Sequence, residues 1–341
     1  MIRVVVAEDS AVVRAHLVHL LDGDELLSVV GEAADGEAAV AMAERQRPDV
    51  VVLDIHMPRM DGYQAARAIM ERAPAPIVMA TASANRSDTQ TAFDALEAGA
   101  LVVVEKPRGP GDPRAEEAAR ELIRTVRLMA GVKVVRRWPA RTPVARGPEP
   151  CKAPKVIAMA ASTGGPAVLA AMLRQMDYEL GCPLLLVQHI SPGFTEAFAD
   201  WLGTSTWRPV KLARAGELTE RDIVYVAPAE QHLGIAKGGR IMLRPRGSVN
   251  GFCPSASHLF GSVADAYGSA AAGIVLTGMG RDGAEGLGRL RKAGGVTIAQ
   301  DQASSVVFGM PAAAIESGAA ELVLSPDRIV ATIRQLTGGR A

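Results

Sequence analysis

Short runs of β-branched residues alternate with amphipathic stretches of helical period through the first 107 residues. Such alternation is typical of βα units, which assemble into a parallel sheet with helices on both faces. The runs predict strands at residues 3–7, 27–32, 50–54, 77–81 and 101–105. Apolar residues in steps of three and four then predict a closing helix at 113–129. Residues 1–130 are therefore expected to form a doubly wound domain of five βα units.

The composition changes at residue 131, where Arg, Pro, Gly and Ala dominate and no period persists. This change predicts a basic linker over 131–154, and we interpret its charge as that of a solvated tether rather than of a nucleic-acid patch. Apolar strand-like runs resume at residue 155. Residues 155–341 are thus expected to form a second doubly wound, parallel-sheet α/β domain of the Rossmann-like kind.

The formal net charge of zero hides an uneven distribution. Residues 1–130 carry 14 Lys and Arg against 21 Asp and Glu, whereas residues 131–341 carry 23 against 16. Most of this positive excess lies in the linker, since residues 156–341 carry 16 against 15. A nearly neutral second domain without an evident helix-turn-helix segment predicts no nucleic-acid partner.

The N-terminus lacks the apolar run of a signal peptide, and no stretch reaches the roughly 18 apolar residues of a membrane span. The three cysteines share no ligand spacing with histidines, which predicts free thiols. We therefore expect a cytoplasmic protein with no membrane insertion.

Acidic residues follow two of the predicted strands of the first domain. Glu8 and Asp9 come directly after the first strand, and Asp54 ends the third. The carboxyl ends of parallel strands share one edge of the sheet, so these carboxylates are expected to meet there. Adjacent negative charges repel one another unless a cation lies among them, and Mg²⁺ prefers such oxygen ligands. The sequence therefore predicts a Mg²⁺ site formed by Glu8, Asp9 and Asp54.

Two further polar residues are expected at the same edge, because Thr81 ends the fourth strand and Lys106 follows the fifth. An aspartate that accepts a phosphoryl group needs positive charge and a hydroxyl near the transferred oxygens. With the Glu8-Asp9 pair and Asp54 in the segment DIHMPRMDG, this domain resembles the receiver domains of response regulators. The resemblance implies that a histidine kinase phosphorylates Asp54 and that Thr81 and Lys106 serve the phosphorylation switch.

A serine lies on the first strand-to-helix turn of the second domain, in the segment 162–165, STGG. On such a turn the hydroxyl of Ser162 is exposed beside a helix N-terminus, whose N–H groups stabilise an oxyanion. The same segment by itself equally fits a phosphate-binding loop with Ser162 as a helix N-cap. The choice between nucleophile and cap depends on which side chains lie beside the serine.

Histidine and aspartate follow two other predicted strands. His189 comes after the strand at 183–187, and Asp282 lies in the glycine-rich turn after the strand at 273–276. A serine hydroxyl needs a base to remove its proton, and imidazole serves best when a carboxylate fixes its tautomer. Ser162, His189 and Asp282 are therefore expected to form a catalytic triad. Their order along the chain differs from that of the α/β-hydrolases and argues against that superfamily.

Four segments of the second domain resemble the chemotaxis protein-glutamate methylesterases, the CheB family, whose members join a receiver to an esterase. The segments are STGG at 162–165, QH with PGFT at 188–195, LTGMGRDGA at 276–284 and SSVVFGMP at 304–311. The resemblance implies a serine hydrolase that cleaves receptor glutamate methyl esters and deamidates glutamines, with no cofactor in the esterase site. The implied partners are a histidine kinase of the CheA type and a methylated chemoreceptor.

The resemblance also assigns roles to individual residues. Ser162 is the implied nucleophile, His189 the base and Asp282 the acid that orients the base. The backbone N–H of Met279 is implied as an oxyanion donor, and Thr163 is implied to lie beside the histidine.

Three positions depart from the family pattern. Val103 stands where many receivers have an aromatic residue, which puts the aromatic switch in doubt. Cys253 and Ser257 stand where relatives have arginine and aspartate, which bears on substrate recognition. His232 and His258 are candidates for lining the substrate cleft and are the two alternatives to His189 as the base.

Two other functions stay open on the sequence. The chain could be a receiver with a DNA-binding output, which salt-dependent DNA binding would favour. It could also be a catalytically silent module that docks on receptors, which ester release dependent on Ser162 would exclude.

Overall fold

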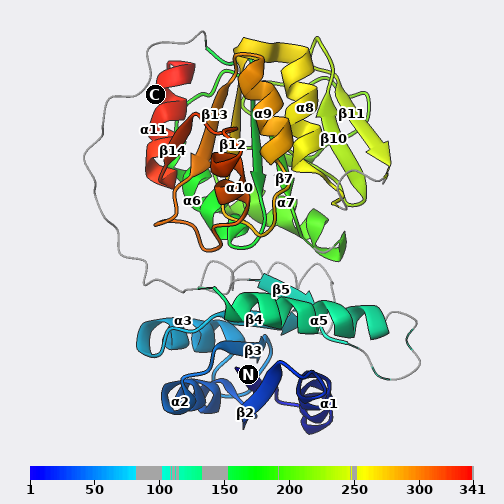
Figure 1. Ribbon diagram of the computed structural model, residues 1–341, viewed down its shortest axis with the longest axis vertical. Coiled ribbons are helices and arrows are strands. Elements are labelled where there is room, and N and C mark those ends of the chain that lie inside the picture. Colours follow the sequence, from blue (N-terminus) through cyan, green and yellow to red (C-terminus); the bar gives the residue numbers. More distant parts are fainter. Residues whose placement is uncertain are drawn as a thin grey trace. The chain divides into compact units, whose positions relative to one another are not determined.

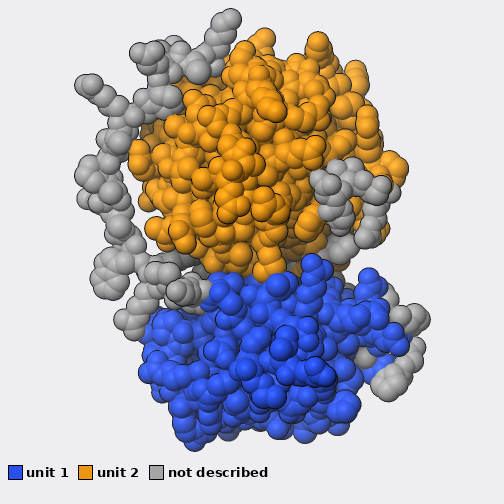
Figure 2. Space-filling view, viewed as in Figure 1, with its two compact units in different colours: residues 1–140 blue, residues 141–341 orange. Residues whose placement is uncertain are grey.

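The computed structural model describes residues 1–81, 102–107, 109, 112, 115–132, 153–190, 192–245, 247 and 252–339. The chain forms two compact units, residues 1–140 and 141–341 (Figure 2). The predicted linker at 131–154 lies mostly outside the described residues. Each unit is built around one parallel sheet (Figure 1), so the prediction of two doubly wound α/β folds is confirmed.

The N-terminal unit has a five-stranded parallel sheet in the order β2-β1-β3-β4-β5. Its strands are β1 Ile2–Ala7, β2 Leu27–Ala33, β3 Val50–Asp54, β4 Ile77–Thr81 and β5 Val102–Glu105. Its helices are α1 Ala11–Asp22, α2 Gly36–Gln46, α3 Gly62–Arg72 and α5 Ala115–Ala130. The helices contact one another in two pairs, α1 with α5 and α2 with α3. Strands β3 and β4 are buried at every position, which explains their continuous apolar character.

The C-terminal unit has a seven-stranded parallel sheet in the order β14-β13-β12-β6-β7-β9-β8. The strands are β6 Val156–Ala161, β7 Leu184–Gln188, β8 Val210–Leu212, β9 Val224–Val226, β12 Ala271–Val275, β13 Val296–Gln300 and β14 Leu322–Leu324. The helices are α6 Gly165–Gln175, α7 Thr195–Ser205, α8 Ala256–Tyr267, α9 Ala284–Lys292, α10 Met310–Glu316 and α11 Pro326–Thr337. Short 3₁₀ turns lie at Pro192–Phe194 and Gly268–Ala270.

The chain order across this second sheet reverses between β6 and β12. From β6 the chain proceeds to β7 on one side, and it later returns to place β12 on the other. Ligands of open parallel sheets bind at the carboxyl ends of the strands beside such a reversal. The topology therefore predicts a ligand site among the residues that follow β6, β7 and β12.

An antiparallel hairpin, β10 Gln231–Ile235 and β11 Ile241–Pro245, is the part of the described fold that the sequence analysis did not anticipate. Its turn uses Gly238 and Gly239 at φ values of 87° and 86°, a region open to glycine. The hairpin packs against α8 (Figure 1). None of the described helices combines the length and apolarity needed to cross a lipid bilayer.

Candidate active site

Ser162 directly follows β6, beside the reversal in strand order. Its N–H donates to the Thr277 carbonyl and its carbonyl accepts from the Gly165 N–H. Helix α6 has Gly164 as its N-cap, at φ 76°, and receives no side-chain cap. The structure therefore does not support the interpretation of Ser162 as a helix N-cap and leaves its hydroxyl uncommitted to the helix.

His189 lies at the neighbouring strand end. The register of β6 and β7 pairs Ala161 with Gln188, and the His189 N–H donates to the Ala161 carbonyl at 2.9 Å. The buried amide of Gln188 donates to the carbonyls of Ser162 and His189, at 2.9 Å each. One side chain thus ties together the backbones that carry the predicted nucleophile and base.

Asp282 meets the imidazole of His189, as predicted. His189 Nε2 lies 3.0 Å from Asp282 Oδ2, and the aspartate side chain is wholly buried. A carboxylate only accepts hydrogen bonds, so Nε2 carries the proton and Nδ1 presents a lone pair. Nδ1 is buried and has no hydrogen-bond partner within the described part of the chain. Ser162 Oγ therefore does not donate a hydrogen bond to His189 Nδ1 in this structure. In many enzymes such a hydrogen bond between nucleophile and base forms only when substrate is bound.

Five donors surround the Asp282 carboxylate. Oδ2 accepts from His189 Nε2 and the Ala256 N–H, while Oδ1 accepts from Ser255 Oγ and the N–H groups of Ser257 and Gly283. Burial by itself would raise the pKa of this carboxyl, but the hydrogen bond and charge of His189 and the backbone donors lower it to about 2. Asp282 is therefore ionised at neutral pH, with its orientation fully determined.

Two of those donors, Ala256 and Ser257, are the first residues of α8. The positive end of the helix macrodipole thus faces the Asp282 carboxylate. Ser255 is the N-cap of α8 and also donates its hydroxyl to Asp282. Sequence analysis missed Ser255, although a serine before an apolar helical run is an N-cap signal. The sequence pattern does not indicate that the N-terminus of α8 points at Asp282.

The turn after β12 closely approaches Ser162 because residue 278 has no side chain. A Cβ on Gly278 would lie 2.7 Å from Ser162 Cβ and 2.5 Å from Met310 Sδ. The Gly278 carbonyl accepts from Gly309 and Met310, which holds this turn in place. Met279, the predicted oxyanion donor, follows directly, and its N–H has no acceptor among the residues described. The segment 304–311 therefore supports the turn rather than supplying catalytic groups.

The remaining predicted residues lie nearby without joining the triad. The Thr163 carbonyl accepts a hydrogen bond from Thr277 Oγ1. Among the described residues, no hydrogen bond links the Thr163 side chain to His189. The Phe252 ring stacks on the His189 imidazole, with centroids 4.9 Å apart. Phe252 restricts rotation of the imidazole, a role that only the folded structure reveals.

The acidic cluster of the N-terminal unit forms as predicted. Ligand oxygens of Glu8, Asp9 and Asp54 lie within 4.8 Å of one another. Lys106 Nζ lies 2.6 Å from both Glu8 Oε2 and Asp54 Oδ1, and Thr81, which is buried, ends the neighbouring strand. Burial, aided by the Asp54 carboxylate, raises the pKa of Glu8 despite the hydrogen bond from Lys106. A bound cation in addition to Lys106 would offset the repulsion among the three carboxylates, so their oxygens fit Mg²⁺.

Comparison with known proteins agrees with this geometry. The family model described as CheB methylesterase matches residues 157–333, and that of the response regulator receiver domain matches residues 4–115. A protein-glutamate methylesterase/protein-glutamine glutaminase of Myxococcus xanthus is 48% identical over 96% of this chain and 94% of its own. The chain belongs to the CheB methylesterase family. A relative with the same activities in its name, from Nitrosospira multiformis, is 42% identical over 100% of this chain and 98% of its own.

Among solved structures, the CheB methylesterase catalytic domain of Thermotoga maritima is 34% identical to this chain. The match covers 54% of this chain and 98% of the Thermotoga maritima chain, with a TM-score of 0.50. The parallel sheet of the C-terminal unit therefore has the architecture of a CheB catalytic domain.

The three departures from the CheB pattern have definite surroundings. Ser257 Oγ accepts from the Gly283 N–H at 2.9 Å, so this serine supports the turn that carries Asp282. Cys253 is a partly buried cysteine shortly before α8. Val103 is buried within β5.

Neither alternative histidine takes the place of the base. His232 is buried in β10, and its Nδ1 accepts from the Ser255 N–H at 3.2 Å. The His258 ring lies tilted against the His232 ring, with centroids 5.3 Å apart. Among the described histidines, Asp282 contacts His189 alone, which supports His189 as the base of this family member.

We expect His232→Leu to lower kcat for ester hydrolysis by about tenfold while KM stays within about twofold, because a buried N–H at Ser255 loses its acceptor. Steady-state kinetics on a methylated protein substrate measure both constants. His232→Asn, whose amide oxygen can accept from Ser255, is expected to recover most of the loss. Equal kcat values for the leucine variant and the wild type would contradict this supporting role.

Proposed function

We propose that this chain hydrolyses glutamate methyl esters and deamidates glutamines of proteins through Ser162, His189 and Asp282, under control of phosphorylation at Asp54. The observation that carries the proposal is the state of the His189 ring. Its Nε2 is bound to a buried carboxylate, while its Nδ1 is an unpartnered base at the strand end next to Ser162.

The reaction follows from these positions. Ser162 Oγ attacks the ester carbonyl carbon while its proton moves to His189 Nδ1. The tetrahedral intermediate then expels methanol, which takes the proton from Nδ1. Water attacks the acyl-serine, passes a proton to Nδ1 and releases the glutamate carboxylic acid with Ser162 restored. A glutamine amide follows the same course and expels ammonia.

Two features stabilise the charges that develop. The Met279 N–H is the proposed donor to the oxyanion, because Met279 follows Gly278, which closely approaches Ser162. The Asp282 carboxylate, held ionised by its five hydrogen bonds, balances the positive charge that His189 acquires.

The receiver is proposed to accept its phosphoryl group on Asp54 from a histidine kinase of the CheA type. Glu8, Asp9 and Asp54 would hold Mg²⁺, which when bound neutralises charge on the transferring oxygens. Lys106 already lies 2.6 Å from Asp54 Oδ1, where it would pair with the phosphoryl group. Thr81 ends the adjacent strand and is proposed as the hydroxyl that reports phosphorylation.

The proposed protein substrate is a methylated chemoreceptor. We propose that the chain acts in the cytoplasm, since the buried Cys182 is a free thiol, which suits a reducing compartment. A DNA-binding output is not favoured, because the C-terminal unit matches the methylesterase model over residues 157–333.

Methanol release from a methylated chemoreceptor tests activity and control together. We expect the full chain to release methanol, and a small-molecule phosphodonor to raise the rate several-fold, a partial population shift. Asp54→Asn should keep the unstimulated rate and lose the response, whereas Glu37→Gln, an exposed acid outside the cluster, should respond normally. Absence of methanol under both conditions would overturn the proposed function.

A further inference from the structure

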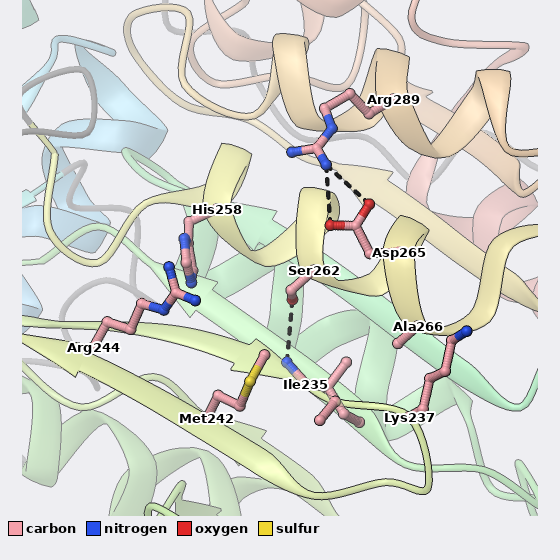
Figure 3. A pocket seen from close by; sticks show the side chains of 10 residues that line it. Ile235, Lys237, Met242, Arg244, His258, Ser262, Asp265, Ala266 and Arg289 are labelled. Carbon is pink, nitrogen blue, oxygen red and sulfur yellow. Dashed lines mark hydrogen bonds and ion pairs between the residues drawn. The ribbon is translucent and has the colours of Figure 1, made fainter.

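A pocket of about 330 Å³ lies between the β10–β11 hairpin, α8 and the side chain of Arg289 from α9 (Figure 3). The charged residues that line it are Lys237, Arg244, Arg289 and Asp265. Arg289 is paired with Asp265 at 2.9 and 3.0 Å. Lys237 and Arg244 are exposed, and neither forms an ion pair within the described ranges. The pocket thus retains two uncompensated cations.

The two uncompensated cations lie at opposite ends of the pocket. Arg244 pairs with His232 in the hairpin register, whereas Lys237 lies beyond the last residue of β10. Strand β10 ends at Ile235, three residues and about 10 Å beyond the level of Arg244, and Lys237 lies two residues further, in the turn. Figure 3 shows the two side chains at either end, with Met242 and Ile235 between them. Because the two cations lie at either end of the pocket, a chain segment with several carboxylates can pair with both.

His258 forms part of the pocket wall and adds no negative charge. Its Nε2 is buried without a hydrogen-bond partner among the described residues. Burial lowers the pKa of His258, and the positive charges of Arg244 and Arg289 act in the same direction. The electrostatic field in this part of the pocket is therefore positive, which favours an anionic occupant.

The Arg244 end of the pocket adjoins the residues that hold the Asp282 carboxylate. His258 belongs to the first turn of α8, and its N–H donates to Ser255 Oγ. His232, opposite Arg244 in the register, accepts from the Ser255 N–H. Ser255 in turn donates to Asp282. A segment bound in the pocket would lie along α8, whose N-terminus holds the catalytic carboxylate.

We propose that this pocket binds an acidic segment of the protein substrate, with carboxylates paired to Arg244 at one end and Lys237 at the other. The inference rests on the proposed function, because a protein whose glutamates are methylated and demethylated carries carboxylates around the reacting side chain. The pocket then holds unmodified glutamates while an esterified one reaches Ser162. Pairing at two exposed sites contributes to KM and leaves the chemical step unchanged.

The double variant Lys237→Glu/Arg244→Glu in the full chain tests the pocket. We expect KM for a methylated chemoreceptor to rise about tenfold, with kcat within about twofold, since attraction becomes repulsion at two exposed positions. The matched control, Lys155→Glu/Arg221→Glu, makes the same change in charge at exposed positions before β6 and β9, away from the catalytic edge. Hydrolysis of a small neutral methyl ester by the pocket variant should match the wild type. The KM difference should shrink as salt increases.

An unchanged KM in the pocket variant, or an equal rise in the control variant, would overturn the inference. So would an equal loss with the small ester, because it would indicate damage to the catalytic site itself. Competitive inhibition of the wild type by millimolar inorganic phosphate that disappears in the pocket variant would assign a small-anion site instead. Ser162→Ala, assayed in parallel, distinguishes the two proposals: its continued activity contradicts the proposed function, whereas an unchanged KM contradicts the pocket alone.

Discussion

Replacing Ser162 with alanine is expected to lower kcat for methanol release by about 10⁴-fold or more, because the proposed mechanism forms the acyl intermediate on the Ser162 hydroxyl. The substitution removes one oxygen and leaves the backbone hydrogen bonds to Thr277 and Gly165 intact. We therefore expect stability to change by less than about 1 kcal/mol. Methanol release and thermal unfolding of the same preparations measure the two effects.

Ser205→Ala provides a matched control for this loss, since Ser205 ends α7 outside the site and its replacement should leave kcat unchanged. Mass spectrometry of the wild type quenched during turnover should find the glutamyl adduct on the peptide that contains Ser162. If the alanine variant kept a rate within about tenfold of the wild type, another residue or a directly activated water would have to be the nucleophile.

The second large effect is expected from Asp282→Asn, with kcat lower by about 10³–10⁴-fold. Three donors converge on Oδ1, so the amide oxygen must take that position and the NH₂ group must replace Oδ2. There it faces the Ala256 N–H and can only donate to His189 Nε2. The ring proton then moves to Nδ1, which can no longer accept the proton of Ser162.

The same variant should lose stability in a pH-dependent manner. Because the Asp282 pKa is lowered from 3.8 to about 2 in the folded protein, its ionisation stabilises the fold above about pH 4. That contribution, about 2 kcal/mol, is lost as the pH falls through about 2. In denaturant unfolding of the C-terminal unit, the difference in free energy of unfolding between wild type and variant should therefore become smaller as the pH falls.

Asp177→Asn, a change at an exposed acid outside the site, is the control and should alter neither kcat nor the pH dependence. A kcat for Asp282→Asn within about tenfold of the wild type would show that the His189 tautomer does not limit the reaction.

The positions of the reacting residues were predictable because one rule of parallel sheets governs them. Ser162, His189 and Asp282 each follow a strand, as do Glu8, Asp9 and Asp54 in the other unit, and strand ends share an edge. Hydrophobic periodicity locates the strands to within a few residues, which suffices to bring these side chains to one side of a sheet. The predicted strand at 273–276, for example, is β12 Ala271–Val275, and the shift leaves Asp282 at the same edge.

Sequence by itself therefore determined both folds and the family, and it predicted which side chains meet at the edge of each sheet. Only the tertiary structure decided which nitrogen of His189 faces Asp282, what holds Asp282, and where a charged pocket lies. Those features depend on α8 and the β10–β11 hairpin, which meet the triad from segments distant along the chain. The direction of a helix end and the packing of a hairpin depend on long-range contacts, and local patterns of residues do not encode them.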